Sequence, residues 1–549
     1  MQPVLTSAQM REIDRATTER YGIPSLVLME NAAAATARVI ASASPEIANS
    51  SVLVLCGRGN NGGDGAATAR LLAHAGANVT AVLFGNIADT KGDARTNFEA
   101  LASLAQDSSA KGTARLIECG DDDLCRRVLH ENLTVSPDVI VDALFGTGLK
   151  RPLQSVHLEA ARLVNAQRDL LSTNQLVVSI DVPSGLDADS AEPIGEAIHA
   201  DVTVTMTAPK VANVVPPASN FNGRLIVADI GSPSELISEA RTELFLTDES
   251  VVRPWLFATR FTPDSYKNTH GHAIVVAGSR GYTGAAVLCA NAAMRSGAGL
   301  VTVATPASAQ TIVATQVMPE VMTTALAETD RGVVSDEAFD FFSKFSEKAD
   351  VIAIGPGLSS EDERTRKFVR QVVEYRRVPV VIDADGLNCL SPWPAELRGS
   401  SEMPIVLTPH PGEMLRLMGT SDKAALNDRI AAARKFATQH DVILLLKGGR
   451  SLVAAPDGRV FLNSTGNAGL GTAGAGDTLT GVITGFLAQA KSSERVTALN
   501  TVIAALYVSG LAGDLAAREL GMRCMVASDI REHLSAAICS IDPRGEQPR

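Results

Sequence analysis

The stretch best suited to chemistry is GTAGAGDTLTGVIT, residues 471–484, which runs into an Ala/Leu-rich helical pattern. Its glycines and alanines let the backbone turn tightly, so that several N–H groups converge at a helix N-terminus, a favourable place for phosphate. Asp477 then stands where it can take a proton from a hydroxyl group or assist a leaving group. Asp477 would serve equally well as a helix cap, so its neighbours must decide between the two interpretations.

Polar residues and glycines follow several predicted strands in the second half of the chain. Strands are expected within 272–279, 300–305, 350–357, 378–385, 404–410 and 442–449, with a hairpin at 451–463 and helices at 283–296, 475–488 and 496–516. If the sheet is parallel, its strand ends bring together Gly284, Gly357, Asp385, His410, Lys447 and Asp477. Alone, His410 would be a capping residue, Lys447 a solvated charge, and Asp383 and Asp385 turn carboxylates. Their shared position beside an amide pocket favours a nucleotide site.

The first half has its own glycine-rich stretch, GRGNNGGDG at 57–65, between an apolar strand at 51–56 and a helical pattern at 66–75. Strand, glycine-rich loop and helix in this order form a phosphate-binding turn, although the spacing is neither GxGxxG nor that of a Walker loop. Helices are expected before it at 7–20 and 26–43, and strands after it at 78–84, 138–142, 176–181, 202–206 and 224–229. Their alternation with helices predicts a doubly wound parallel sheet.

Oxygen-bearing side chains follow several strands of this predicted sheet. Asn61, Asp142 and Ser184 each lie at or just after a strand end, so we expect them at one edge. Oxygen ligands suit a hard cation better than zinc. Each residue alone would be an ordinary turn residue, but three oxygen-rich loops at strand ends favour a shared site.

Length and composition limit the class of protein. A chain of 549 residues is too long for one ordinary domain, so we expect two large α/β domains at 1–240 and 250–540, with a short connector within 232–252. The net charge of −12 argues against a nucleic acid or an anionic membrane surface as a partner. Seven cysteines without a CxxC pair, an N-terminus unlike a signal peptide and short apolar runs predict a reduced, cytoplasmic protein.

The motifs of the first half resemble the N-terminal epimerase domain of the NAD(P)H-hydrate repair enzymes. The similarity rests on GIPSLVLMENA (22–32), NNGGDG (60–65), DALFGTGL (142–149), DVPSGLDAD (181–189), TAPK (207–210) and VADIG (227–231). It implies a Rossmann-like three-layer sandwich that inverts C6 of hydrated NADH and NADPH, called NADHX and NADPHX.

The same resemblance implies binding residues. The hydrated nucleotide would contact Asn60, Asn61, Gly62, Gly63, Asp64, Gly146, Thr147, Gly148, Leu149, Lys150, Arg151, Pro152 and Asp181. A potassium ion would be held by Asn61, Asp142 and Ser184. Asp181 is also our candidate for the catalytic group that moves the proton, because a carboxylate at a strand end facing the ligand can act as a base.

The second half resembles the ribokinase-like superfamily and, within it, the dehydratase domain of the same repair enzymes. The similarity rests on GHAIVVAGS (271–279), RSGAGLVTVAT (295–305), VIAIGPGL (351–358), DADGLN (383–388), TPHPGEM (408–414), KGG (447–449) and GTAGAGDTLTGVITG (471–485). It implies that ADP or ATP, with ADP expected, is the phosphoryl donor and contacts Lys447, Gly448, Gly449, Arg450, Ser451 and Gly476. The S epimer of the hydrated nicotinamide would contact Ala285, Gly357, His410 and Asp477.

The implied chemistry suits these residues. A hydroxyl group at C6 leaves poorly, but its phosphorylation makes the loss of phosphate easy and restores the conjugated reduced ring. Asp477 would be the catalytic base that accepts the hydroxyl proton. The glycine amides, with Mg²⁺, would stabilise the charge on the transferring phosphate.

Three functions fit these residues: a bifunctional epimerase and dehydratase, a kinase of a small alcohol such as a vitamin precursor with a regulatory first domain, and an enzyme whose first domain only binds a ligand. The fusion favours the first, since both activities act on one damaged cofactor, and the intact polar loops argue against the third. We expect a homo-oligomer acting on small molecules. The sequence does not give the oligomeric state or the preference for ADP over ATP.

Overall fold

The computed structural model describes residues 1–44, 46–106, 112–168, 175–491 and 496–542. The chain divides into a first unit, Gln2–Thr242, and a second unit, Glu243–Arg549 with Met1. The division falls within 232–252, the stretch in which a short connector is expected. This stretch contains α8 (Ser234–Glu239) and β9 (Leu244–Leu246), two elements that the sequence did not predict. β9 is too short to show a pattern, and it forms by parallel pairing with β18 (Val460–Leu462).

The first unit is built on a parallel sheet with the strand order β4-β3-β2-β5-β6-β7-β8. Its strands are β2 (Ser51–Cys56), β3 (Asn78–Leu83), β4 (Thr113–Glu118), β5 (Val139–Ala143), β6 (Leu176–Ile180), β7 (Val202–Met206) and β8 (Arg224–Ala228). The predicted strands are confirmed, and β4 is an addition. β4 escaped prediction because it is an edge strand without buried residues.

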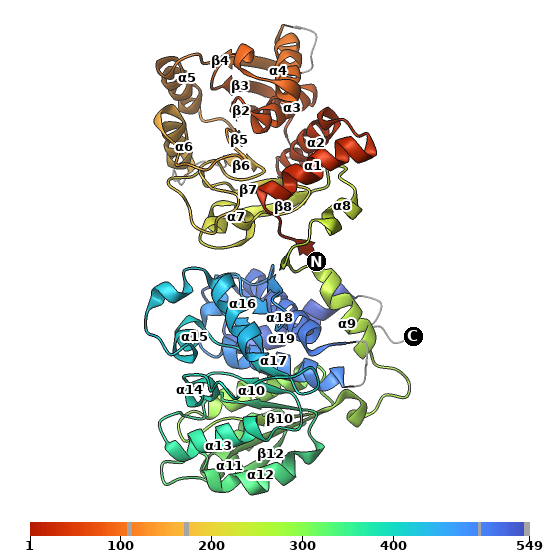
Figure 1. Ribbon diagram of the computed structural model, residues 1–549, viewed down its shortest axis with the longest axis vertical. Coiled ribbons are helices and arrows are strands. Elements are labelled where there is room, and N and C mark those ends of the chain that lie inside the picture. Colours follow the sequence, from red (N-terminus) through yellow and green to blue (C-terminus); the bar gives the residue numbers. More distant parts are fainter. Residues whose placement is uncertain (45, 107–111, 169–174, 492–495, 543–549) are drawn as a thin grey trace. The chain divides into compact units, whose positions relative to one another are not determined.

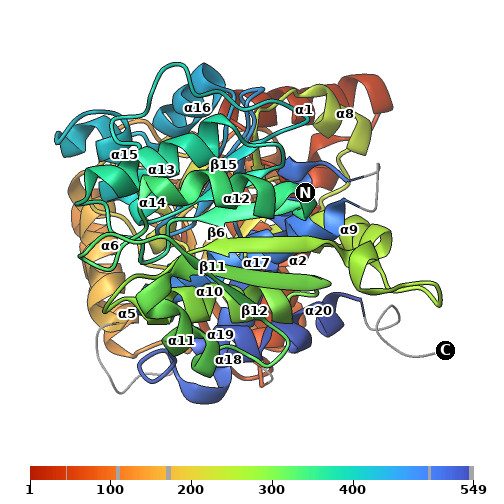
Figure 2. The ribbon, with the colours of Figure 1, turned by 90° about the horizontal axis from the view of Figure 1, so that it is seen from below.

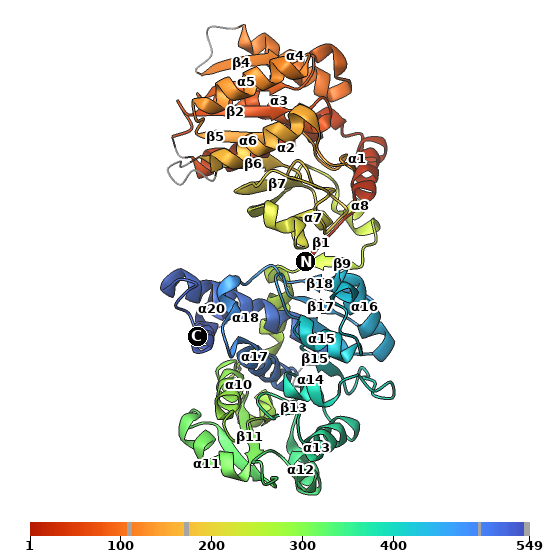
Figure 3. The ribbon, with the colours of Figure 1, turned by 90° about the vertical axis from the view of Figure 1, so that its left-hand side faces the viewer.

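Helices cover both faces of this sheet and make three layers (Figures 1 and 3). Alternate residues of β2 pack on opposite faces: Val52 and Val54 join the core under α2 (Ser25–Ala43), α3 (Asn60–His74) and α4 (Gly92–Ala105). Leu53 and Leu55 join the core under α5 (Asp122–Thr134) and α6 (Ser155–Arg168). This unit also contains β1 (Gln2–Pro3), α1 (Ser7–Tyr21) and α7 (Val211–Val214). The predicted doubly wound architecture is confirmed.

The first glycine-rich stretch is helical rather than a loop, which corrects the helix start expected at Ala66. α3 begins at Asn60, so NNGGD forms its first turn. The glycines are needed for close packing, because a Cβ atom at Gly62 would lie 1.7 Å from the carbonyl oxygen of Gly57. A Cβ atom at Gly65 would lie 2.5 Å from Cβ of Ala143. They bring the start of α3 against the ends of β2 and β5.

The sheet of the second unit has the order β9-β18-β17-β16-β15-β14-β13-β10-β11-β12. Its further strands are β10 (His272–Val276), β11 (Leu300–Pro306), β12 (Met322–Leu326), β13 (Val351–Ile354), β14 (Val380–Ile382), β15 (Ile405–Leu407), β16 (Ile443–Leu446) and β17 (Leu452–Ala454). Pairing is parallel from β12 to β16 and antiparallel in β16-β17-β18, where the predicted hairpin lies.

Helices also cover both faces of the second sheet (Figures 2 and 3). One layer holds α10 (Thr283–Arg295), α11 (Ala307–Gln316), α17 (Ala475–Ala490), α18 (Ala498–Leu520), α19 (Ala527–Glu532) and α20 (Leu534–Ile541), with α9 (Val252–Thr259) beside it. The other holds α12 (Phe339–Phe345), α13 (Glu363–Glu374), α14 (Asp385–Cys389), α15 (Pro411–Leu417) and α16 (Arg429–His440). The carboxyl ends of the parallel strands therefore open onto one edge, as predicted.

Although their uninterrupted apolar runs are short, α2 and α18 are long enough, and their mean hydropathy is high enough, to cross a membrane. In an apolar 18-residue segment of each helix, 39% of the segment in α2 and 67% of the segment in α18 is buried. Both helices contribute to hydrophobic cores, for example through Leu28 of α2 and Val502 of α18. Helices buried in a hydrophobic core meet the same criterion of length and hydropathy, and α2 and α18 pack as core helices do.

Gly62→Ala tests the packing of α3. The added methyl group would collide with the carbonyl oxygen of Gly57, so we expect the first unit to lose about 1–3 kcal/mol of unfolding free energy. Gly59→Ala is the matched control, because nothing lies within 4 Å of its Cβ position.

The two units can be followed separately in urea. Both tryptophans, Trp255 and Trp393, lie in the second unit, so its unfolding is read by tryptophan fluorescence. Gly62→Ala should leave that transition unchanged and shift the far-UV circular dichroism transition of the first unit. Equal dichroism midpoints for the two variants would contradict the packing described for α3.

Candidate active sites

The first unit has a cavity of about 570 Å³ at the carboxyl ends of its strands. Predicted residues in its wall are Asn60, Asn61, Asp64, Gly146, Thr147, Gly148, Leu149 and Asp181. Gly62 and Gly63 are instead buried in the helix packing, and Lys150, Arg151 and Pro152 lie outside the wall. Asp14 and Lys210, which the sequence did not single out as site residues, line the cavity too.

A buried ion pair holds Asp181 in place. Nζ of Lys210 lies 2.5 Å from Oδ1 of Asp181, and the lysine side chain is only 1% exposed. The same ammonium donates to Oγ1 of Thr205 at 2.9 Å and to the carbonyl oxygen of Met206 at 3.0 Å. Asp181 itself has a φ of +69°, an unfavourable value for a residue with a side chain. The strained backbone of Asp181 and its ion pair with Lys210 indicate a functional position.

Two further carboxyl groups face the same ion pair. The pKa of Asp14 is raised to about 6, mainly by burial; the charge of Lys210 opposes the shift and the charge of Asp181 adds to it. Burial, followed by the charges of Asp181 and Asp14, raises the pKa of Asp64 well above its usual range. Asp14 and Asp64 therefore retain protons more readily than free carboxyl groups do.

Asp142 and Ser184 meet directly, beside the cavity. Asp142 is fully buried, and its Oδ1 accepts from Oγ of Ser184 at 2.6 Å while its Oδ2 accepts from the backbone N–H of Ser184 at 2.8 Å. Burial raises the pKa of Asp142 against these hydrogen bonds. The side chain of Asn61 lies beside Gly146 and Asp181: a Cβ atom at Gly146 would be 3.0 Å from Oδ1 of Asn61 and 3.2 Å from Oδ2 of Asp181.

The donor set of these three residues fits a monovalent cation. Asp142 carries a buried negative charge, and no cationic side chain bonds to it among the described residues. Nδ2 of Asn61 is buried without a hydrogen-bond partner in the described part of the chain, so the amide can turn its oxygen toward an ion. No group of three or more His, Cys, Asp or Glu residues that could hold a metal ion occurs in the described ranges.

The second unit has a comparable ion pair at its strand ends. Asp383, 1% exposed, follows β14, and its Oδ1 lies 2.6 Å from Nζ of Lys447, which follows β16. Its Oδ2 accepts from Oγ1 of Thr480 at 2.6 Å. Gly476 of α17 packs directly on the lysine, because a Cβ atom there would lie 3.1 Å from Nζ. Lys447 and the first turn of α17 therefore meet, as the sequence predicted.

Asp477 stands in the first turn of α17, next to this pair. Burial raises its pKa to about 6, with a further contribution from the charge of Asp383, while Lys447 acts in the opposite direction. The charges of Asp385 and Glu413 make smaller contributions to the same shift in the pKa of Asp477. A carboxyl group of this kind can accept a proton near neutral pH.

The loop after β16 exposes backbone amides. Arg429 donates to the carbonyl oxygens of Gly449 and Lys447 at 2.9 and 3.2 Å, which fixes the loop. Gly448 and Arg450 both have positive φ values, +142° and +50°. Within the described residues the N–H groups of Gly448, Gly449 and Arg450 have no backbone or side-chain acceptor. Loops of this form bind phosphate through their amides.

The remaining predicted residues gather around the same strand ends. Gly357, with a φ of +64°, follows β13, and a Cβ atom there would lie 3.0 Å from Cβ of Ala285. His410 caps α15, its Nδ1 accepting from the N–H of Gly412 at 3.0 Å. Its Nε2 lies 3.4 Å from a buried carboxylate, Glu413, whose pKa burial raises.

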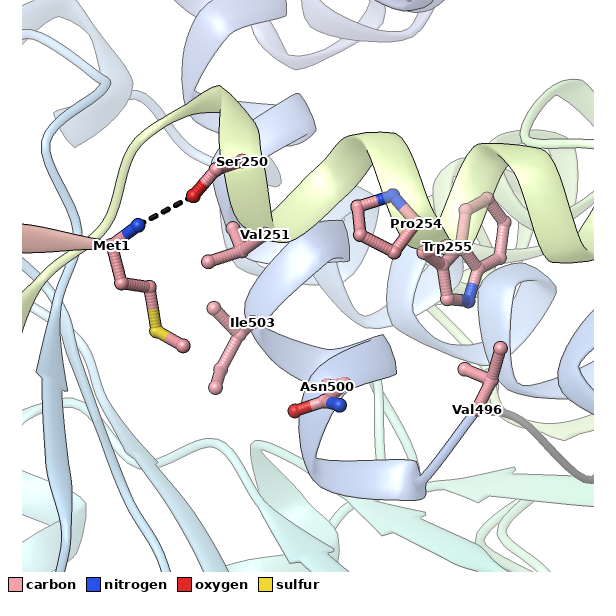
Figure 4. Close-up of a pocket in the computed structure, with 8 residues that line it drawn as sticks. All are labelled: Met1, Ser250, Val251, Pro254, Trp255, Val496, Asn500 and Ile503. Atoms are coloured by element: carbon pink, nitrogen blue, oxygen red, sulfur yellow. Dashed lines mark hydrogen bonds between the residues drawn. The ribbon is translucent and has the colours of Figure 1, made fainter.

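A smaller pocket of the second unit lacks such chemistry (Figure 4). It encloses about 160 Å³ and is lined by Met1, Ser250, Val251, Pro254, Trp255, Val496, Asn500 and Ile503. Its one ionic group is the N-terminal ammonium, which bonds to Asp248 and Ser250. We do not assign it a catalytic role.

Sequence reasoning weighed Asp383 as a turn carboxylate at a strand end but did not single out Lys210 as a site residue. Lys210 follows β7 as Asp383 follows β14, so the rule that polar residues at strand ends form sites could have found it too. Asp14 lies in the middle of α1, and nothing in its local sequence distinguishes it from the exposed acids of that helix.

The fold and the sites define an enzyme with two α/β units. Each unit is built on a sheet of mainly parallel strands and carries a site with carboxylates and a lysine at the strand ends. Residues 25–212 match the family model described as the YjeF-related protein N-terminus, and residues 273–536 match that of NAD(P)H-hydrate dehydratase. The bifunctional NAD(P)H-hydrate repair enzyme of Moorella thermoacetica is 39% identical over 99% of this chain and 98% of its own length. That of Salinibacter ruber is 38% identical over 96% of this chain and 94% of its own.

The chain therefore belongs to the family of bifunctional NAD(P)H-hydrate repair enzymes. A solved ADP/ATP-dependent NAD(P)H-hydrate dehydratase from Bacillus subtilis, co-crystallised with ATP and Mg²⁺, is 29% identical. It covers 55% of this chain and 100% of its own, with a TM-score of 0.46.

Lys210→Met tests the buried ion pair of the first unit. The substitution leaves Asp181 without its cation, so we expect a loss of about 3 kcal/mol of unfolding free energy. The control is Lys150→Met, which removes an ion pair to Asp187 and Asp189 from a lysine that is 49% exposed. That change should cost less than about 1 kcal/mol. Similar urea midpoints for the two variants, read by far-UV circular dichroism, would show that the burial of Lys210 contributes little.

Proposed function

We propose that this chain repairs hydrated NADH and NADPH with two activities. The first unit interconverts the R and S epimers at C6, and the second dehydrates the S epimer at the expense of ADP or ATP. The observation that carries the proposal is one chain with two separate acid–base sites that is similar over 99% of its length to a bifunctional repair enzyme. The two activities suit one chain because both act on the same damaged cofactor.

In the dehydratase reaction, Asp477 removes the proton of the C6 hydroxyl group. The oxygen attacks the terminal phosphorus of the nucleotide, whose bridging P–O bond breaks and leaves a shortened nucleotide. Loss of the phosphate from C6 and of a proton from C5 then forms the C5–C6 double bond. The raised pKa of Asp477 supports its role as the base.

The nucleotide would lie across the loop that follows β16. Lys447, Gly448, Gly449, Arg450 and Ser451 supply its amides and cations, and Gly476 lets the phosphates approach Lys447 closely. Mg²⁺ bound to these phosphates would supply further charge neutralisation. Ala285, Gly357 and His410 would contact the hydrated nicotinamide, since they lie around the same strand ends as Asp477.

In the epimerase site, Asp181 is proposed as the base, held in position by its ion pair with Lys210. The hydrated nucleotide would occupy the first-unit cavity against Asn60, Asn61, Asp64 and the loop at 146–149. K⁺ held by Asn61, Asp142 and Ser184 would neutralise the buried charge of Asp142 and steady the neighbouring loops. Lys150, Arg151 and Pro152 would contact the nucleotide outside the cavity wall.

The kinase of a small alcohol is the less favoured function, because the similarity extends across both units and names a repair enzyme in each relative. A first unit that only binds a ligand would not need a strained aspartate, two further carboxyl groups and a buried lysine in one cavity. We further propose a cytoplasmic homo-oligomer whose partners are these small molecules.

The proposal is tested with NADPHX supplied as a mixture of R and S epimers, in the presence of Mg²⁺ and K⁺. Near-ultraviolet absorbance of the reduced nicotinamide is followed with ADP, with ATP and with neither. Nucleotide-dependent recovery of essentially all the absorbance is expected. Recovery of the S fraction alone would refute the epimerase, and a stable phosphorylated alcohol without any recovery would favour the kinase.

Asp477→Ala should lower the rate of dehydration at least about 100-fold and leave the interconversion of the epimers unchanged, because the two sites lie in different units. Asp181→Asn is the reciprocal control, with epimerisation lost and dehydration of the S epimer retained. Chromatographic separation of the epimers measures both rates. Loss of both activities in either variant would argue against separate sites.

The dehydratase should lose activity in acid. Asp477 is a base only when ionised, and its pKa is raised to about 6. We expect kcat/KM for the S epimer to be level above about pH 6 and to fall about tenfold per pH unit below it. Short initial-rate assays with saturating nucleotide would measure this profile. A rate that stays level down to about pH 4, the ordinary carboxyl range, would contradict the role given to Asp477.

A further inference from the structure

Asp14 has the surroundings of a functional group although no motif marks it. It lies in α1, and Met10 and Arg11, about one turn before it, line the same first-unit cavity, so one face of the helix is turned to the ligand space. Oδ1 of Asp14 is buried and has no hydrogen-bond partner within the described residues. A buried polar atom without a partner is costly and needs an explanation, which a ligand in the cavity would provide.

The helix that carries Asp14 is firmly fixed. The backbone N–H of Ser7 donates to Oδ1 of Asp189 at 2.6 Å, and the Ser7 hydroxyl group donates to the other oxygen of the same carboxylate. Asp189 also pairs with Lys150 at 2.9 Å, which ties α1 to the loop that lines the cavity. Gln9 donates to the carbonyl oxygen of Ala240 at 2.6 Å. Asp14 is therefore held in position rather than left on a loose surface helix.

The charges around Asp14 leave it without a dedicated cation. Lys210 is the buried lysine of the cavity, and its ammonium is occupied by Asp181, Thr205 and Met206. Asp64 adds a third carboxyl group, which is half-buried. The other titratable side chains in the cavity wall are Arg11, Arg58, Asp93 and His157. Oδ1 of Asp14 thus has no hydrogen-bond partner within the described residues, whereas Asp181 forms an ion pair with Lys210.

We propose that Asp14 is a second acid–base group of the epimerase site and acts with Asp181 on the C6 hydroxyl group of the hydrated nicotinamide. The inference rests on the proposed function of the first unit. Inversion at C6 needs one group that gives a proton and one that takes a proton, and a single carboxylate in a fixed position serves only one of these needs at a time.

The proposed step balances as follows. The carboxylic acid of Asp14 protonates the C6 oxygen, the C6–O bond breaks with its electron pair leaving as water, and the lone pair of N1 forms a C6–N1 double bond. Water then adds to the opposite face of C6 while the Asp181 carboxylate removes one of its protons. The pair holds one proton before and after the step, and the reverse reaction exchanges the two roles.

Asp14→Asn keeps the size of the side chain but can neither give nor take this proton. We expect epimerisation to fall about 100-fold or more. In the unaltered chain epimerisation should also decline as the pH rises through about 6, because burial raises the pKa of Asp14 to about 6 and the acid is lost above it. In Asp14→Asn this decline should disappear from the residual rate.

The control is Glu12→Gln on the same helix, whose side chain is 60% exposed and pairs with Arg15 at the surface. It should keep the epimerase rate within about twofold. Dehydration of the S epimer in each preparation reports on folding and concentration, and it should not change in either variant.

Three results would overturn the inference. These are an Asp14→Asn rate within about threefold of the unaltered chain, a decline with rising pH that persists in the variant, or an equal loss of both activities, which would give Asp14 a role in folding only. An unaltered chain that dehydrates the S epimer but does not interconvert the epimers would instead refute the proposed function, and the inference with it.

Discussion

Each unit depends on one lysine, buried in the first unit and half-buried in the second, that lies among more carboxyl groups than it can neutralise. In the first unit Lys210 is committed to Asp181 at 2.5 Å, and in the second Lys447 is committed to Asp383 at 2.6 Å. The remaining carboxyl groups repel the paired one and lie in places that water reaches poorly. Burial is the largest cause that raises the pKa of Asp14 in the first unit and of Asp477 in the second to about 6, and a neighbouring carboxylate adds to it in each case. Both groups can therefore exchange protons near neutral pH.

Parallel sheets create that crowding. Each strand ends at the same edge, so residues far apart in sequence, such as Asp383 and Lys447, come within bonding distance. Glycines then let a helix start close to this edge. Gly62 brings α3 against the end of β2, and Gly476 lets α17 approach the lysine. Both units therefore use glycines to bring a helix start close to the strand ends, and the sites formed there carry out different reactions.

The two glycine-rich stretches show which features of the backbone can be predicted from local sequence and which cannot. Both predict a tight approach of a helix to a strand end, and both units have one. The sequence does not say whether the glycines form a loop or the helix itself. In the second unit the helix begins at Ala475, as predicted, whereas in the first it begins at Asn60, six residues earlier than Ala66. The difference comes from contacts with Gly57 and Ala143, which only the folded sheet supplies.

By itself the sequence determined the two parallel α/β units, the loops at their strand ends and the position of Asp477, because hydrophobic periodicity and glycine spacing are local properties. Only the tertiary structure decided which charges meet. Asp14 joins the first site because α1 packs across the strand ends, and Asp181 is matched with Lys210 because β6 and β7 are neighbours. A pKa depends on burial and on charges from distant segments, so no local pattern could give it.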